Sequence, residues 1–151
     1  MVKVKKIYES QKLEIFYPAT DTSLELPLIE AGLSAGFPSP AEDYIEMRLD
    51  LNKELIKNPS STFFGRVNGN SMIEAGIYDG DILIIDKSIE PKNNSVLVCF
   101  IDGEFTVKKV SIIKNEMYLI PENKDFSPIK IAPESDFRLW GVVTYSVHKL
   151  I

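Results

Sequence analysis

Ser71 and Lys108 are the residues of this sequence whose type and setting could support catalysis without a metal ion or a histidine. Ser71 lies in VNGNSMIEAGIYDGDILIID, residues 67–86, where an expected strand ends and a short helical turn begins. Backbone N–H groups at such a corner point outward without intrahelical partners, so they can stabilise the oxyanion formed when a serine attacks a carbonyl. The sequence therefore offers a nucleophile that still needs a base.

A lysine can be that base if burial lowers its pKa from about 10.4 toward neutrality. Lys108 and Lys109 are adjacent in DGEFTVKKVSII, residues 102–113, which has the composition of a strand. Side chains alternate along a strand, so the two lysines point to opposite faces, and one of them shares the face of Thr106 and Val110. If that face is covered, its lysine loses hydration and can act as a base.

Both candidates also have a simpler structural interpretation. Ser71 with Glu74 three residues later is the pattern of a capping box, in which the serine only caps a helical turn. Both lysines could lie along the surface and keep their ammonium groups in water. No local spacing links Ser71 to Lys108, and the S-x-x-K pattern of β-lactamases is absent because Glu74 occupies the position of its lysine. Residue types alone leave these alternatives open.

Other familiar chemistry is excluded by the residue inventory. The single histidine, His148, cannot form a two-histidine metal site, and its alternating strand pattern predicts a surface or edge position. The single cysteine, Cys99, lies in the apolar run VLVCFI and is expected to be a small buried hydrophobe. No Walker loop or G-x-G-x-x-G motif is present. No cofactor and no metal are expected.

The bulk composition, 44% hydrophobic and 26% charged over 151 residues, is typical of one globular domain with an appendage. The net charge of −5 argues against direct nucleic-acid binding, which needs a concentrated basic surface. The longest apolar runs, ILII and VLVCFI, are too short for a membrane span, and no secretory signal follows the N-terminal lysines. A cytoplasmic protein without membrane contact is expected.

The order of segments predicts a mostly β fold with two parts. Residues 1–36 alternate short apolar pieces with polar residues and predict an extended N-terminal arm. Asp50 is a plausible N-cap for a short helix that ends before Asn58 and Pro59. Residues 37–151 form the expected domain, a compact antiparallel β structure with turns between its strands. The expected strands are TFFGRVN, DILIID, SVLVCFI, EFTVKKVSII, EMYLIP, IKIA and LWGVVTYSV.

Four segments, taken together, resemble a known family. AGFPSPAEDYIEMRLDLN, VNGNSMIEAGIYDGDILIID, DGEFTVKKV and LIPENKDFSPIKI occur in order and resemble UmuD proteins of bacterial SOS mutagenesis, which belong with the LexA-type self-cleaving Ser-Lys peptidases of family S24. The resemblance runs from about Leu26 to the C-terminus. It implies a LexA-like β domain, with Ser71 as the nucleophile and Lys108 as its general base. It also implies an oxyanion hole at the backbone N–H groups of Ser71 and Met72.

The resemblance implies a substrate and partners as well. The self-cleaved bond is placed between Ala35 and Gly36 in GLSAGFPSP, where UmuD of the best-known type has Cys-Gly and LexA has Ala-Gly. Small residues suit a scissile strand, because its backbone must come within about 3 Å of the nucleophile. The implied partners are a second copy in a homodimer, the RecA filament on single-stranded DNA, the UmuC polymerase subunit and the sliding clamp.

Three alternatives compete with this interpretation. A LexA-like or phage-type repressor would need a helix-turn-helix domain of about 60 to 70 residues before the cut, and only 35 residues precede Gly36. A non-enzymatic β module would use Ser71 as a cap and expose Lys108. A signal-peptidase-like enzyme acting on other proteins would usually carry a membrane anchor.

Overall fold

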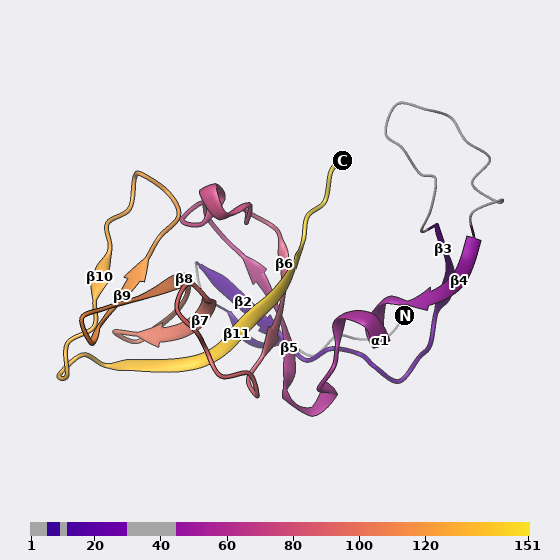
Figure 1. The fold of residues 1–151 in the computed structure, drawn as a ribbon, viewed down its shortest axis with the longest axis horizontal. Coiled ribbons are helices and arrows are strands. Elements are labelled where there is room, and N and C mark those ends of the chain that lie inside the picture. Colours follow the sequence, from indigo (N-terminus) through magenta and orange to yellow (C-terminus); the bar gives the residue numbers. More distant parts are fainter. Residues whose placement is uncertain (1–5, 10–11, 30–44) are drawn as a thin grey trace.

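A computed structural model describes residues 6–9, 12–29 and 45–151 of the protein (Figure 1). Nine strands form one sheet in which every paired neighbour is antiparallel, in the order β1-β2-β5-β6-β11-β7-β8-β9-β10. Their bounds are β1 Lys6–Glu9, β2 Leu13–Phe16, β5 Thr62–Val67, β6 Ile82–Asp86, β7 Val96–Ile101, β8 Glu104–Ile113, β9 Glu116–Ile120, β10 Ile129–Lys130 and β11 Phe137–Val147. The mostly β, antiparallel fold predicted from the sequence is confirmed.

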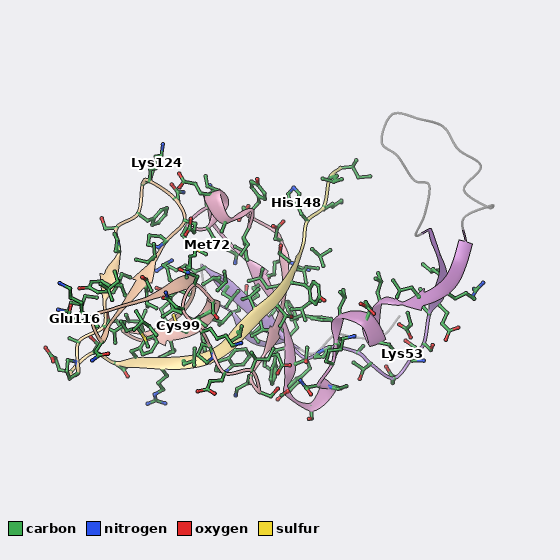
Figure 2. All side chains as sticks on the ribbon, viewed as in Figure 1. Lys53, Met72, Cys99, Glu116, Lys124 and His148 are labelled. Carbon is green, nitrogen blue, oxygen red and sulfur yellow. The ribbon has the colours of Figure 1, made fainter. Side chains whose placement is uncertain are left out.

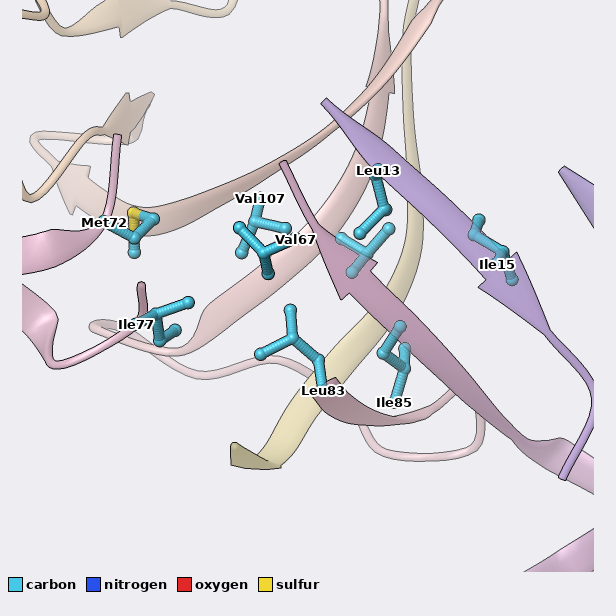
Figure 3. Packing of buried hydrophobic residues seen from close by; sticks show 9 residues of the cluster. Leu13, Ile15, Val67, Met72, Ile77, Leu83, Ile85 and Val107 are labelled. Carbon is cyan, nitrogen blue, oxygen red and sulfur yellow. The ribbon is translucent and has the colours of Figure 1, made fainter. Parts of the chain in front are cut away.

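The sheet curls until strands that are distant in its order meet. β2 contacts β8, although four strands separate them in the sheet, and the enclosed space is filled by one apolar cluster (Figure 3). Burying an aliphatic side chain of this size stabilises a fold by about 1.5 to 3 kcal/mol. The cluster is therefore the main support of the curl. Its buried members are Leu13, Ile15, Val67, Met72, Ile77, Leu83, Ile85, Val98 and Val107.

β11 closes the curl because it bends between two partners. Its first half pairs with β7 and its second half with β6, and its register shifts between Leu139 and Gly141. A side chain at Gly141 would place its Cβ 2.7 Å from Ile85 Cγ2, closer than real contacts allow. Glycine is required here because β11 approaches β6 closely at the bend.

A second sheet of two strands lies apart from the curled sheet. β3 (Glu25–Ile29) pairs with β4 (Ile45–Asp50), and the hairpin projects away from the larger sheet in Figure 1. β4 leads directly into α1 (Leu51–Leu55), whose N-cap Asp50 accepts a hydrogen bond of 3.0 Å from the Asn52 amide. The predicted helix and its cap are confirmed. Pro59 begins a 3-10 turn, η2 (Pro59–Ser61), as expected of a stop signal.

The predicted strands from Thr62 onward all appear, and β4 is an element that the sequence analysis did not predict. The described residues of the predicted arm include three strands, and two of them, β1 and β2, belong to the large sheet. The division of the chain at residue 36 stays a prediction. Within the described ranges, no helix is long and apolar enough to cross a membrane.

Candidate active site

Ser71 is held in a loop that joins two neighbouring strands of the core. The loop begins after Val67, the last residue of β5, and ends before Ile82, the first residue of β6. Two aspartates near its end accept hydrogen bonds from its backbone. Asp79 accepts a hydrogen bond of 2.7 Å from the Gly69 amide. The carboxylate of Asp81, which is only 2% exposed, accepts one of 2.8 Å from the Tyr78 amide. The Asp-Gly-Asp turn predicted at residues 79–81 therefore fixes both ends of the Ser71 loop.

A second element holds the loop from its other side. After β9, Asn123 donates from Nδ2 to the carbonyl oxygen of Asn70 at 2.5 Å, directly before Ser71. The Glu122 carbonyl accepts a hydrogen bond of 2.7 Å from the Glu74 amide. The side chain of Met72 is 1% exposed and is part of the core cluster (Figures 2 and 3). Ser71 thus lies between two fixed neighbours, which limits the movement of its hydroxyl.

The capping-box interpretation of Ser71 is wrong. The helical turn is a 3-10 helix, η3 (Ile73–Ala75), whose N-cap is Met72 and has no side-chain cap hydrogen bond. The Glu74 amide is taken by Glu122 across the loop, so it is not available to a serine cap. Because the turn begins later than the sequence suggested, the Ser71 hydroxyl is free to point elsewhere.

The Ser71 hydroxyl faces the amine of Lys108. Ser71 Oγ and Lys108 Nζ are 3.1 Å apart, and Nζ also lies 3.2 Å from Thr106 Oγ1 and 3.1 Å from the Val107 carbonyl oxygen. A neutral amine has two N–H donors and one lone pair. If the two donors go to Thr106 and Val107, the lone pair is directed at Ser71. This is the geometry needed to accept the hydroxyl proton.

Burial prepares Lys108 for that role. Its side chain is 6% exposed, and the pKa of its ammonium is lowered chiefly by burial, with a smaller contribution from the positive charge of Lys12. The negative charge of Glu104 opposes the shift. In the part of the chain that the structure describes, no carboxylate lies within ion-pair distance of Lys108. The neutral amine is therefore favoured over the ammonium more than at an exposed lysine.

Lys109 takes the opposite face of β8, as the alternation of strand side chains predicts. Its Nζ forms a 2.9 Å ion pair with Glu122, and its side chain is 33% exposed. The prediction that one of the two lysines shares the covered face of Thr106 is confirmed, and that lysine is Lys108. The interpretation that both lysines lie in solvent is wrong for Lys108.

Ser71 and Lys108 open onto a cleft of about 350 Å³. Its walls come from β8, from the loop of Ser71 and from the segment after β9, so an extended peptide could lie along it. The backbone N–H groups of Ile73 and Glu74 are already bonded within the protein, which leaves those of Ser71 and Met72 as the nearest candidates for an oxyanion hole. The lining residues are Lys12, Val67, Asn68, Gly69, Asn70, Ser71, Thr106, Val107, Lys108, Phe126, Ser127 and Ile129.

The other sequence candidates lie in different places. Ala35 and Gly36 are outside the described residues. Cys99 is buried, and burial raises its pKa to about 12, as expected of a structural thiol. His148 is exposed, and its Nδ1 lies 2.5 Å from Oδ1 of Asp81, the last residue of the Ser71 loop. No cluster suited to a metal ion occurs in the described segments.

Two residues of the site were missed by sequence reasoning. Asn123 belongs to the quoted segment LIPENKDFSPIKI, so its inclusion in a shared motif was the available signal. Lys12 had no signal, because its place at the cleft depends on the pairing of β2 with β5. The contact of Asn123 with Asn70 and the position of Lys12 at the cleft both join distant parts of the chain, and local sequence patterns do not predict such contacts.

A serine hydroxyl beside a buried lysine is the arrangement of a Ser-Lys dyad, in which the amine replaces the histidine of other serine peptidases. The family described as Peptidase S24-like matches residues 27–144, a range that contains Ser71 and Lys108. The chain belongs to the peptidase S24-like family. This confirms the family predicted from the four sequence segments.

Relatives within the peptidase S24-like family cover most of the chain. Protein MucA of Salmonella typhimurium is 38% identical over 138 residues, 90% of this chain and 94% of the relative. Protein SamA of Salmonella typhimurium strain LT2 is 42% identical over 123 residues, 82% and 85% of the two chains. LexA repressor 1 of Geobacter sulfurreducens is 36% identical over 125 residues, 82% of this chain but 61% of the repressor. The chain is a self-cleaving serine peptidase of the UmuD type that acts in SOS mutagenesis.

Replacement of Lys108 by methionine should stabilise the protein most at neutral pH. The lowered pKa of Lys108 means that the folded state disfavours its ammonium, so the folded protein gains stability as pH rises from that pKa toward 10.5, where the unfolded lysine also loses its proton. Lys108→Met removes this penalty, and its advantage in free energy of unfolding should shrink between pH 7 and pH 10. Urea unfolding at several pH values measures the trend. Lys109→Met is the control that shows whether the trend is specific to position 108. A gain in free energy of unfolding of Lys108→Met that grows with pH would contradict the prediction.

Replacement of Asn123 by alanine should slow catalysis without changing its pH dependence. The change removes the hydrogen bond to Asn70 and lets the Ser71 hydroxyl move relative to Lys108. A displacement of this kind costs about 10- to 100-fold in rate. The rate of self-cleavage, followed by intact mass, is the measurement. Lys124→Ala, in the same turn but exposed, is the matched control, and an equal loss in both variants would show that Asn123 does not position the site.

Proposed function

We propose that Ser71, with Lys108 as its base, cuts the Ala35–Gly36 bond of this protein and so converts it into fragments 1–35 and 36–151. The observation that supports this best is the 3.1 Å approach of Lys108 Nζ to Ser71 Oγ in a buried setting with two further acceptors for the amine. Both residues line a cleft of about 350 Å³, which is where the scissile segment would bind.

The proposed reaction follows from these contacts. Neutral Lys108 takes the Ser71 proton while Oγ forms a bond to the Ala35 carbonyl carbon, and the carbonyl oxygen becomes an oxyanion facing the backbone N–H groups of Ser71 and Met72. The oxyanion collapses, the C–N bond to Gly36 breaks, and the Lys108 ammonium donates its proton to the departing amine. Water, deprotonated by Lys108, then hydrolyses the Ala35 ester and restores the Ser71 hydroxyl.

The position of the β3–β4 hairpin bears on how the substrate arrives. Residues 30–44, which contain the proposed cut, connect the ends of this hairpin. The hairpin projects to one side of the molecule, whereas Met72, next to Ser71, lies in the body of the curled sheet (Figure 2). The proposal therefore includes both routes, delivery of the Ala35–Gly36 bond to the cleft of its own chain and delivery to the cleft of a second copy.

The wider role is proposed from the family. UmuD-type proteins are latent peptidases whose cleavage is stimulated by the RecA filament on single-stranded DNA, and their trimmed dimers join the UmuC polymerase subunit. We expect the same partners here, with the sliding clamp as a further contact of the polymerase complex. The net charge of −5 supports a division of labour in which RecA and UmuC hold the DNA.

Purified protein should cleave itself between Ala35 and Gly36, and the rate should rise with pH. More Lys108 is neutral as pH passes its lowered pKa, so the rate should level off before pH reaches the ordinary lysine value of 10.5. Ser71→Ala and Lys108→Ala should each lose about 10⁴-fold or more in rate. Intact mass identifies the two fragments. An uncut wild-type chain at pH 10 and with RecA, ATP and single-stranded DNA, or cleavage by either variant at the wild-type rate, would refute the proposal.

Replacement of Lys12 by glutamine should shift the pH profile of cleavage upward. Lys12 lines the cleft and forms a 2.9 Å ion pair with Glu104, and its positive charge lowers the pKa of Lys108. Without it, the Lys108 pKa rises, both because a like charge is lost and because Glu104 loses its partner. The rate should fall at pH 7 and return to the wild-type plateau at high pH. Lys57→Gln, on an exposed site, is the control; a fall of the plateau with no shift would contradict an electrostatic role.

A further inference from the structure

The large sheet contains a strand that precedes the proposed cleavage site. β2 pairs with β5 along its whole length, with Leu13 opposite Val67 and Phe16 opposite Phe64. β2 also pairs with β1, which forms the edge of the sheet. Cleavage between Ala35 and Gly36 would assign β1, β2 and β3 to one fragment and all remaining strands to the other.

The side chains of β2 belong to the core of the protein. Leu13 is 0% exposed and Ile15 is 1% exposed, and both belong to the main apolar cluster (Figure 3). A side chain on Gly65 would place its Cβ 3.2 Å from Leu13 Cδ1, so Leu13 lies against the bare backbone of β5. The same Cβ would lie 2.9 Å from Ile85 Cδ1, so Leu13 and Ile85 together occupy the space over Gly65.

Polar contacts fix the same segment at both ends. The Lys12 carbonyl oxygen accepts a hydrogen bond of 2.8 Å from the Asn68 amide, and Lys12 Nζ forms the ion pair with Glu104. At the other end, the Arg66 guanidinium lies 5.5 Å from the centre of the Phe16 ring. These contacts set the register of β2, since a slip by one residue would turn Leu13 and Ile15 away from the core.

None of these contacts includes the proposed scissile bond. They join Lys12–Phe16 to residues of β5, β8 and the loop after β5, all of which lie in fragment 36–151. A cut after Ala35 breaks the covalent link between the two parts, and residues 35 and 36 take no part in the contacts described above. After the cut, the pairing of β2 with β5 is bimolecular, so it no longer benefits from the high effective concentration that the covalent link provides.

We propose that the edge of β5 is a binding groove for the segment Lys12–Phe16 of this chain, and that fragment 1–35 stays bound to fragment 36–151 after cleavage. The proposal rests on the cleavage site proposed above. Cleavage of the Ala35–Gly36 bond and release of fragment 1–35 are then separate events. The free form 36–151 arises only when fragment 1–35 is displaced, because its departure exposes both an apolar groove and an unpaired strand edge.

The experiment uses a nick that does not depend on self-cleavage. The recognition sequence of a specific viral protease is inserted after Ala35 in the full-length Ser71→Ala variant, and the chain is cut with that protease. Native mass spectrometry and size-exclusion chromatography at micromolar concentration should find both fragments in one complex. Hydrogen exchange should show that residues 62–67 keep the protection of the uncut protein. Failure of self-cleavage in the wild type would refute the proposed function and leave this test intact.

The matched variants locate the groove. Leu13→Ala with Ile15→Ala should weaken retention of fragment 1–35 by about 100-fold or more, since both side chains are buried in the core. Leu24→Ala with Leu26→Ala, at positions 66% and 52% exposed in the same fragment, should leave it unchanged. Separation of the fragments without substitution, loss of protection at residues 62–67 on nicking, or equal weakening by both pairs would overturn the proposal. The protection measurement decides even if the first pair prevents folding.

Discussion

The burial of one amine against one hydroxyl is the constraint on which the rest of the structure depends. Lys108 is 6% exposed, and a lysine in that position is costly unless its N–H groups find acceptors and its charge can be given up. Thr106 and the Val107 carbonyl supply the acceptors, and burial lowers the pKa of the amine so that its charge can be given up. The same burial that weakens the fold at neutral pH makes the amine a base, so stability and reactivity are opposed at this residue.

The Ser71 loop must hold the serine hydroxyl in a precise position relative to Lys108. A hydroxyl on a loop would ordinarily move too freely to stay within reach of a base. Here the loop is bonded to its own end through Asp79 and Asp81, and to the segment after β9 through Asn123. Met72 anchors it in the core beside the reacting residue. The loop is thus part of the packed structure, and the cleft in front of it can admit a strand without disturbing the serine.

How much of this was visible in the sequence depends on the range of each contact. The alternation of β8 predicted that Lys108 and Lys109 face opposite ways, but only contacts with distant residues such as Ser71 decide that the face of Lys108 is the covered one. The capping box predicted at Ser71 does not form, because the 3-10 turn starts one residue later and the Glu74 amide donates to the Glu122 carbonyl. β2 was predicted as part of an arm, since four residues of alternating polarity do not reveal which strand they will pair with.

The N-terminal segment connects the site to the fold. Leu13 and Ile15 help to fill the main apolar cluster, and Lys12 brings a positive charge to the cleft of Lys108. The segment therefore favours the neutral form of the base, because the positive charge of Lys12 repels the ammonium. A strand placed there promotes the reaction that would cut it from the rest of the chain. Any later exchange of that strand would lower the activity of the base and expose the edge of β5 in the same step.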